Sequence, residues 1–278
     1  MNRLTFAKRT QILAMLCEGS SMRSISRVVD VSINTVTKLL VDAGETCLEL
    51  HNELVRDVQA SRIQCNEIWS FRYTKAHTVL GLEDTPEGDG DVWTWTALDA
   101  DTKLMVSYYV GDRSAESAMV VLDDLRCRIA NRVQLITDGH KAYLQAVEGA
   151  FGGDIDYAQL LQIYSQAQGP AGRYSPAKFT AAKKTPIEDG SEMKHVSTSY
   201  VERSNLTIRM SMRRFTRLTN AFSKKIDNHV YALALYFAFD NFTRIHKTLK
   251  VTPAMAAGIT DKLWTLEDIA ERIEARVS

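Results

Sequence analysis

The sequence predicts a mixed α/β fold with a small all-helical part at its N-terminus. Three observations predict it. Apolar residues recur at helical spacing over the first 40 residues, and alternate as in strands from residue 64 onward. Strand-like and helix-like segments then follow one another along the chain. With 278 residues, the protein is long enough for one medium domain and a small accessory domain.

The N-terminal segment has the pattern of three short helices. Residues 4–16 and 22–29 predict the first two, and residues 30–32 form a tight turn. Ser32 is well placed to cap a third helix over residues 33–40, because its hydroxyl can accept a bond from a free backbone N–H. A compact turn before the third helix is typical of the helix-turn-helix, which binds DNA. A purely structural or dimerising bundle is the alternative.

The third of these helices divides into a polar and an apolar set. We expect its apolar residues, Ile33 among them, to form a small core with Ile25, Val28 and Val29 of the second helix. We expect its polar residues to reach bases or phosphates. They are Asn34, Thr35, Thr37 and Lys38.

Four units are predicted along the chain. Residues 1–44 form the helix-turn-helix unit, and residues 45–62 a polar helical linker. Residues 63–260 form the main domain, and residues 261–278 contain an acidic C-terminal helix.

The main domain begins with a series of strands and helices. The expected order is a strand at 64–71, a hairpin at 92–110, a helix at 114–129, a strand at 133–137, a helix at 141–149 and a strand at 157–164. By analogy of element order, this series predicts a ribonuclease-H-like mixed sheet.

The second half of the main domain is read as a loop followed by helices. Residues 165–195 are polar and rich in Gly and Pro, which predicts a long mobile loop. Helices are expected at 200–212, where Glu202 lies, and at 226–244.

Charge is distributed unevenly although the formal net charge is zero. Residues 201–250 hold ten Lys and Arg against three acidic residues. Such asymmetry favours a nucleic-acid-binding face, the alternative being an ordinary solvated helix face. The expected phosphate contacts are Arg203, Arg209, Arg213, Arg214, Lys224 and Lys225.

Cysteine usage and hydropathy indicate the compartment. The four cysteines form no close pair, so the sequence has neither zinc-ribbon spacing nor a disulfide framework. No signal peptide and no apolar run long enough for a membrane span is visible. We therefore expect a cytoplasmic, nucleoid-associated protein with no membrane partner.

Two distant carboxylates carry the chemistry that the sequence suggests. Asp138 ends a buried strand, and Glu202 opens a basic helix. Phosphodiester cleavage can be served by two Mg²⁺ ions, which prefer carboxylate ligands from separate elements. A third ligand is expected on the first strand, which offers Asn66 and Glu67.

With these acids in place, the chain resembles the DDE transposases of the insertion-sequence-one (IS-one) group, in a single-frame form with an N-terminal helix-turn-helix. The segments that carry the resemblance are 64–70, 92–99, 136–140, 199–203 and 241–249. The resemblance implies a ribonuclease-H-like catalytic domain that uses Mg²⁺ or Mn²⁺. It also implies cutting and joining of double-stranded DNA at terminal inverted repeats and target sites. Asp138 and Glu202 match the second and third acids, and Asn66 stands at the first.

Asn66 departs from the family pattern, which has Asp followed by Glu at this place. An amide oxygen can touch a cation but carries no charge to offset it. Either this copy is inactive or strongly impaired, by natural decay or by deliberate substitution, or Glu67 substitutes. Because neighbouring residues on a strand point to opposite faces, Glu67 would need a bulge to reach the metals.

The sequence therefore predicts a DNA transposase that acts as a homodimer or a higher homo-oligomer, since two DNA ends must be joined. Two alternatives stay open. One is a non-catalytic DNA-binding protein descended from a transposase, which Asn66 favours. The other is a helix-turn-helix transcription regulator with a ligand-sensing central domain.

Overall fold

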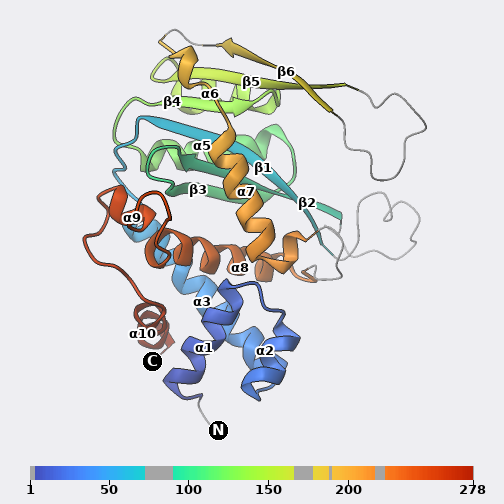
Figure 1. Cartoon of the computed structure of the whole chain (residues 1–278), viewed down its shortest axis with the longest axis vertical. Helices are drawn as coiled ribbons and strands as arrows, with labels where there is room; N and C mark the ends of the chain where they lie inside the picture. The colour runs from blue at the N-terminus through green and yellow to red at the C-terminus, as the bar shows by residue number, and fades with distance from the viewer. Residues whose placement is uncertain (1–3, 73–89, 166–177, 188–189, 217–222, 278) are drawn as a thin grey trace, which may run out of the picture.

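The protein is described here from a computed structural model that covers residues 4–72, 90–165, 178–187, 190–216 and 223–277. Its centre is a six-stranded sheet in the order β3-β2-β1-β4-β5-β6 (Figure 1). The strands are β1 (Arg62–Arg72), β2 (Gly90–Asp99), β3 (Met105–Gly111), β4 (Gln134–Asp138), β5 (Asp156–Ser165) and β6 (Lys178–Pro186).

The sheet is mixed. β1, β2 and β3 pair antiparallel, whereas β4 is parallel to both β1 and β5. A three-stranded meander followed by two parallel strands, with a helix before each of them, is the ribonuclease-H-like arrangement. The predicted mixed α/β fold class is therefore confirmed.

Helices cover both faces of the sheet (Figure 1). α5 (Ala115–Arg128) and α6 (Ala142–Phe151) pack on one face, in a core shared with Cys65 of β1. α7 (Ser199–Ser211) and α8 (Ile226–Ala238) pack on the other, in a core shared with Ile68. Odd and even residues of β1 thus face opposite helix layers, as the period of a strand requires.

Three helices form the N-terminal part, and each begins with a hydroxyl cap. They are α1 (Phe6–Cys17), α2 (Met22–Val29) and α3 (Ile33–Leu54). Thr5, Ser21 and Ser32 each accept a bond from a backbone N–H of the first turn. The predicted starts are close to those observed, but α3 has 22 residues and so includes most of the expected linker.

Gly44 explains how α3 continues through a residue that weakens helices. A Cβ at this position would lie 2.2 Å from Cβ of Tyr231 on α8. Glycine therefore permits close packing of α3 against α8, and this packing stabilises the helix despite the unfavourable propensity of glycine. The unit boundary expected at residue 44 falls inside one continuous helix.

Two residues expected in the N-terminal core lie outside it. Val28 is 63% exposed and Ile33 is 39% exposed, while Ile25, Val29 and Val36 are buried. The apolar stripe of α2 is narrow because a helix of 8 residues turns only one side toward α1 and α3. Ile33 opens α3 at the rim of the bundle, where few partners are available.

The long loop expected over residues 165–195 contains the strand β6, so this prediction was wrong within the described residues. β6 pairs antiparallel with β5 and forms one edge of the sheet. Its sequence includes Lys183 and Lys184 and few β-branched residues. Lysines are common on edge strands, where they oppose pairing with other chains. The segments 166–177 and 188–189 of the expected loop lie outside the described residues.

The C-terminal region returns to the N-terminal helices. α8 passes into a π-helical turn (Phe239–Thr243), and the buried Asn241 amide there bonds to both the N–H and the carbonyl of Met105. After the short α9 (Pro253–Ala256), the acidic helix α10 (Leu266–Val277) packs on α1 and α3. Arg276 of α10 pairs with Glu45 and Glu49 of α3.

Two 3₁₀ turns, η1 (Met193–His195) and η2 (Arg213–Phe215), flank α7. None of the helices that the structure describes combines the length and the apolar character needed to cross a membrane.

The Gly44 contact gives a testable prediction. We expect Gly44→Ala to lower the free energy of unfolding by about 1–3 kcal/mol, because the added methyl group overpacks the α3–α8 contact. Gly149→Ala is the matched control: it is also in a helix, and an added Cβ meets nothing within 4 Å. Its expected effect is a gain of about 0.5–1 kcal/mol. Urea unfolding of both variants measures the difference, and equal effects would contradict the packing account.

Candidate functional site

The site lies where β1 and β4 separate. These parallel strands pair from Arg62 and Gln134 up to Gln64 and Ile136. In the same register Asn66 is level with Asp138, two residues beyond the last pair. Ile136 packs with Val196 before α7, and side chains two apart share a face. Asn66 and Asp138 therefore both emerge on the α7 side of the sheet.

Gln64 of β1 holds the start of α7 against that strand. Its side chain is 2% exposed, and its carbonyl oxygen accepts bonds from the backbone N–H groups of Tyr200 and Val201, both at 3.0 Å. The first N–H groups of a helix have no partner within the helix, so Gln64 supplies the missing acceptor. The next residue of α7 is Glu202, which is thereby held on the face that carries Asn66.

The Glu202 carboxylate is exposed and oriented by neutral donors. Its Oε1 accepts bonds from Nε2 of Gln162, at 2.6 Å, and from the Thr198 hydroxyl, at 2.5 Å. Gln162 lies on β5, two residues beyond Leu160, the partner of Asp138 in the sheet. A carboxylate in the first turn of a helix is also favoured by the helix dipole.

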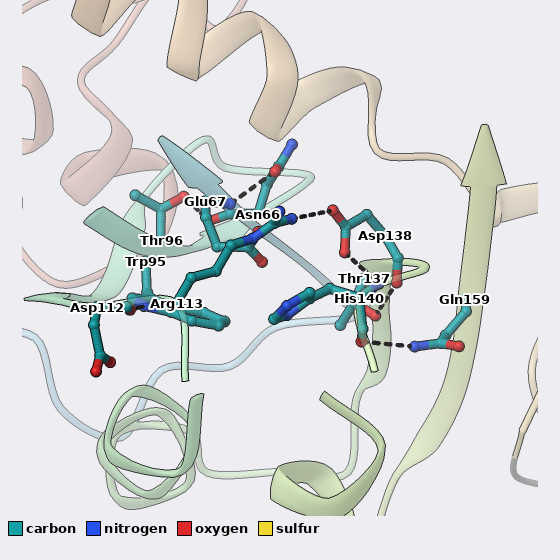
Figure 2. Close-up of polar contacts among 10 residues, drawn as sticks. All are labelled: Asn66, Glu67, Trp95, Thr96, Asp112, Arg113, Thr137, Asp138, His140 and Gln159. Carbon is teal, nitrogen blue, oxygen red and sulfur yellow. Dashed lines mark hydrogen bonds and ion pairs between the residues drawn. The ribbon is translucent and has the colours of Figure 1, made fainter. Parts of the chain in front are cut away.

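The Asp138 carboxylate is held from two sides (Figure 2). Its Oδ1 accepts a bond of 2.9 Å from the backbone N–H of His140. Its Oδ2 lies 4.0 Å from Nη2 of Arg113, a residue just before α5. The His140 ring packs near Trp95 and Tyr143, and burial lowers the pKa of this imidazole, as does the charge of Arg113.

Glu67 approaches the site from the other face. The register of β1 and β2 is unbroken through this residue, so no bulge turns Glu67 toward α7. Its buried carboxylate instead pairs with Nη2 of Arg113 at 3.0 Å (Figure 2). Burial raises the pKa of Glu67, and the nearby charge of Asp138 raises it further. Arg113 thus links two carboxylates that would otherwise repel each other.

Asn66 is satisfied by its own strand. Its side-chain Oδ1 accepts a bond of 2.7 Å from the N–H of Glu67, a donor left without a sheet partner once β4 has turned away. The residue is half-buried beside Thr96, whose hydroxyl bonds to the Asn66 carbonyl.

The donor set fits a divalent cation only in part. Asp138 and Glu202 offer carboxylate oxygens, and Asn66 offers a neutral amide oxygen, all of the kind that Mg²⁺ accepts alongside water. Among the described residues, no group of three or more His, Cys, Asp or Glu side chains is placed to hold a metal ion.

The predicted DNA contacts are distributed over two regions. On α3, Asn34 and Lys38 are exposed and Thr35 and Thr37 are half-buried. Lys38 forms an ion pair with Asp42 at 2.6 Å. On and after α7, two of the predicted basic residues, Arg209 and Arg214, are half-buried. The other four are exposed: Arg203, Arg213, Lys224 and Lys225.

Three residues of the site were not predicted from the sequence: Gln64, Arg113 and Gln162. Arg113 follows directly on Asp112 after a strand, which reads as turn chemistry. Gln64 stands in one of the segments that carry the family resemblance, and its place two residues before Asn66 is the only signal that it shares that face.

Comparison with known proteins finds distant structural likeness alone. The sequence matches no protein-family model, and no curated protein matches it. A piggyBac transposase synaptic complex with hairpin DNA is similar over 98% of this chain and 72% of the other, with 8% identity and a TM-score of 0.47. The Mos1 strand transfer complex is similar over 56% of this chain and 59% of the other, with 15% identity and a TM-score of 0.25. A Mos1 mariner paired-end complex with Mn is similar over 85% of this chain and 76% of the other, with 13% identity and a TM-score of 0.27.

The role assigned to Gln64 is open to direct test. We expect Gln64→Met to lower the free energy of unfolding by about 1–3 kcal/mol, because the N–H groups of Tyr200 and Val201, the second of them buried, lose their acceptor. Gln145→Met, on the exposed side of α6, is the matched control and should be near neutral. Hydrogen exchange at Tyr200 and Val201 should also become faster in Gln64→Met. Unchanged exchange at these two amides would contradict the assigned role.

Proposed function

We propose that this chain is a DNA transposase, or a descendant of one, that binds the ends of a mobile element through its N-terminal helices. The observation that supports the proposal is the strand register, in which Asn66 is level with Asp138 where β1 and β4 separate, together with the Gln64 bonds that hold the start of α7, the helix of Glu202, against β1. These are the three positions at which the IS-one pattern has its acids.

The roles follow from the contacts. Asp138 and Glu202 would hold the divalent ions, Mg²⁺ or Mn²⁺, with the Asn66 amide oxygen as a weaker third donor. The chemistry that such ions supply is activation of an attacking oxygen and stabilisation of the leaving oxygen. Each carboxylate has one oxygen fixed by protein donors, Asp138 by the His140 N–H and Glu202 by Gln162 and Thr198. Oε2 of Glu202 would then face a ligand, whereas Oδ2 of Asp138 lies 4.0 Å from Nη2 of Arg113, and a ligand there would share this oxygen with the guanidinium.

DNA binding is assigned to the N-terminal helices and to the basic residues that follow Glu202. Exposed cations near the acids would hold the phosphates of the DNA while strands are cut and joined, which makes binding strongly salt-dependent. Two protomers would be needed to bring two terminal inverted repeats together with target DNA. We also propose that the protein requires Mg²⁺ or Mn²⁺, acts as at least two protomers and is associated with the nucleoid.

Asn66 favours a second candidate function, DNA binding without turnover. An amide at the first position removes a negative charge from a site that must hold divalent cations. A protein of this kind would use the same DNA surfaces, for example to occupy element ends without cutting them.

A strand-transfer assay separates the two. Duplex DNA from the flanks of the coding sequence is incubated with a supercoiled plasmid and Mg²⁺ or Mn²⁺. We expect Asn66→Asp to raise the strand-transfer rate by at least about 100-fold over the natural chain, because it restores a charged metal ligand. The double variant Asn66→Asp with Asp138→Asn is the control and should lose the gain.

The outcomes are distinct. Activity in Asn66→Asp alone supports a transposase impaired at one residue. DNA binding by both proteins with transfer by neither favours the second candidate. Transfer that persists without Asp138 would refute the assignment of the site.

A further inference from the structure

A second polar site lies where the N-terminal helices meet the end of α7. A cleft of about 1100 Å³ opens there, and we call it the junction cleft. One wall is formed by the α1–α2 connection and the first turns of α2 and α3. The other is formed by residues 212–214, Ser223, Lys224 and α8. The walls touch at Gly19, where a Cβ would lie 2.7 Å from the carbonyl oxygen of Ser211, the last residue of α7.

The junction cleft is lined by positive charge. Arg23 comes from α2, and Arg213, Arg214 and Lys224 come from the segment after α7. None of the described lining residues is acidic, and none of these four cations forms an ion pair with a described carboxylate. Four unneutralised cations around one cavity make a strong local field for an anion.

Arg214 is the most constrained of the four. Its Nη1 donates to the Ser223 hydroxyl at 2.5 Å, and its Nη2 reaches the Met22 sulfur at 3.9 Å. A guanidinium has five donors in a planar fork, and these two contacts involve no charged acceptor. Burial lowers the pKa of Arg214 to about 10, as expected for a cation that has lost water without gaining a carboxylate. Such a group is stabilised strongly by an anion that accepts two bonds from the fork.

The surroundings indicate which anion. The cleft is also lined by Asn34 and Thr37, from the polar face of the helix proposed to read DNA. We propose that the junction cleft binds a backbone phosphate of duplex DNA, held by Arg214 and Arg213 on one wall and by Arg23 on the other. The proposal rests on the proposed function and deepens it: one phosphate would bridge the end-recognition helices and the helix that carries Glu202.

The consequence for the reaction is mechanical. The two walls join α2 and α3 to α7, whose first turn is fixed to β1 by Gln64. DNA bound in the cleft would therefore hold the recognition helices in a defined position relative to the carboxylates. Binding and cutting would be coupled through one shared contact.

The test is the salt dependence of binding to a duplex of arbitrary sequence. We expect Arg213→Met and Arg214→Met each to weaken binding on the order of tenfold, equally for all sequences. The slope of log K against log salt should fall by about 1 in each. Arg126→Met is the matched control, since Arg126 lies on α5, across the sheet, and pairs with Asp154. It should change neither quantity.

Arg213 is exposed, so Arg213→Met should leave the fold intact. The test therefore remains valid even if Arg214→Met does not fold. Arg214→Lys should retain the salt slope. Slopes equal to that of the natural chain in both Met variants would overturn the proposal while leaving DNA binding intact. A natural chain that binds no duplex would instead overturn the proposed function, and this proposal with it.

Discussion

The two hydrogen bonds from the α7 backbone to the Gln64 side chain are the constraint on which the site depends. They join a central strand to the start of a helix 136 and 137 residues away in sequence. A buried amide oxygen with two N–H partners is well satisfied, whereas the same N–H groups without it would be costly. Because Gln64 and Asn66 share a face of β1, this contact also holds the start of α7, where Glu202 lies, on the face of β1 that carries Asn66.

The second constraint is the end of pairing between β1 and β4. Beyond Gln64 and Ile136 the strands separate, and the unpaired N–H of Glu67 turns to the Asn66 side chain. Opening a parallel pair in this way leaves room for side chains at the carboxyl ends of adjacent strands, a common location for ligand sites in α/β sheets. Arg113, which precedes α5, lies between Glu67 and Asp138 and pairs with both carboxylates. One guanidinium therefore offsets the repulsion of two acids that flank the opening.

Much of this could be predicted from local sequence. Strand-like patterns marked β1, β2 and β4, helical spacing marked α1 and α2, and helical spacing with a cap at Ser32 marked the start of α3. The mixed fold class followed from the order of these elements. The continuation of α3 through Gly44 could not be predicted, because a tertiary contact with Tyr231 overrides the propensity of glycine. β6 was missed because its lysine-rich edge sequence lacks the pattern of a buried strand.

For the candidate site, Asp138 and Glu202 were predicted from the sequence, while the residues that contact them were not. Arg113, Gln64 and Gln162 contact residues that are far away in the sequence, so a local sequence pattern cannot predict these contacts. The exposed position of Ile33 has a similar origin: its helical spacing suggests a core residue, but its neighbours in space are those of the junction cleft.

The most direct test of the central claim, that positions 66, 138 and 202 form one cation site, is the affinity for Mn²⁺ measured by calorimetry without DNA. Asn66→Asp should bind Mn²⁺ on the order of tenfold or more tightly than the natural chain, because it adds a charged oxygen ligand. Adding Glu202→Gln to that variant should abolish the gain, and adding Glu67→Gln should not. A gain that survives the loss of Glu202 would contradict the account, since α7 would then contribute nothing to the site.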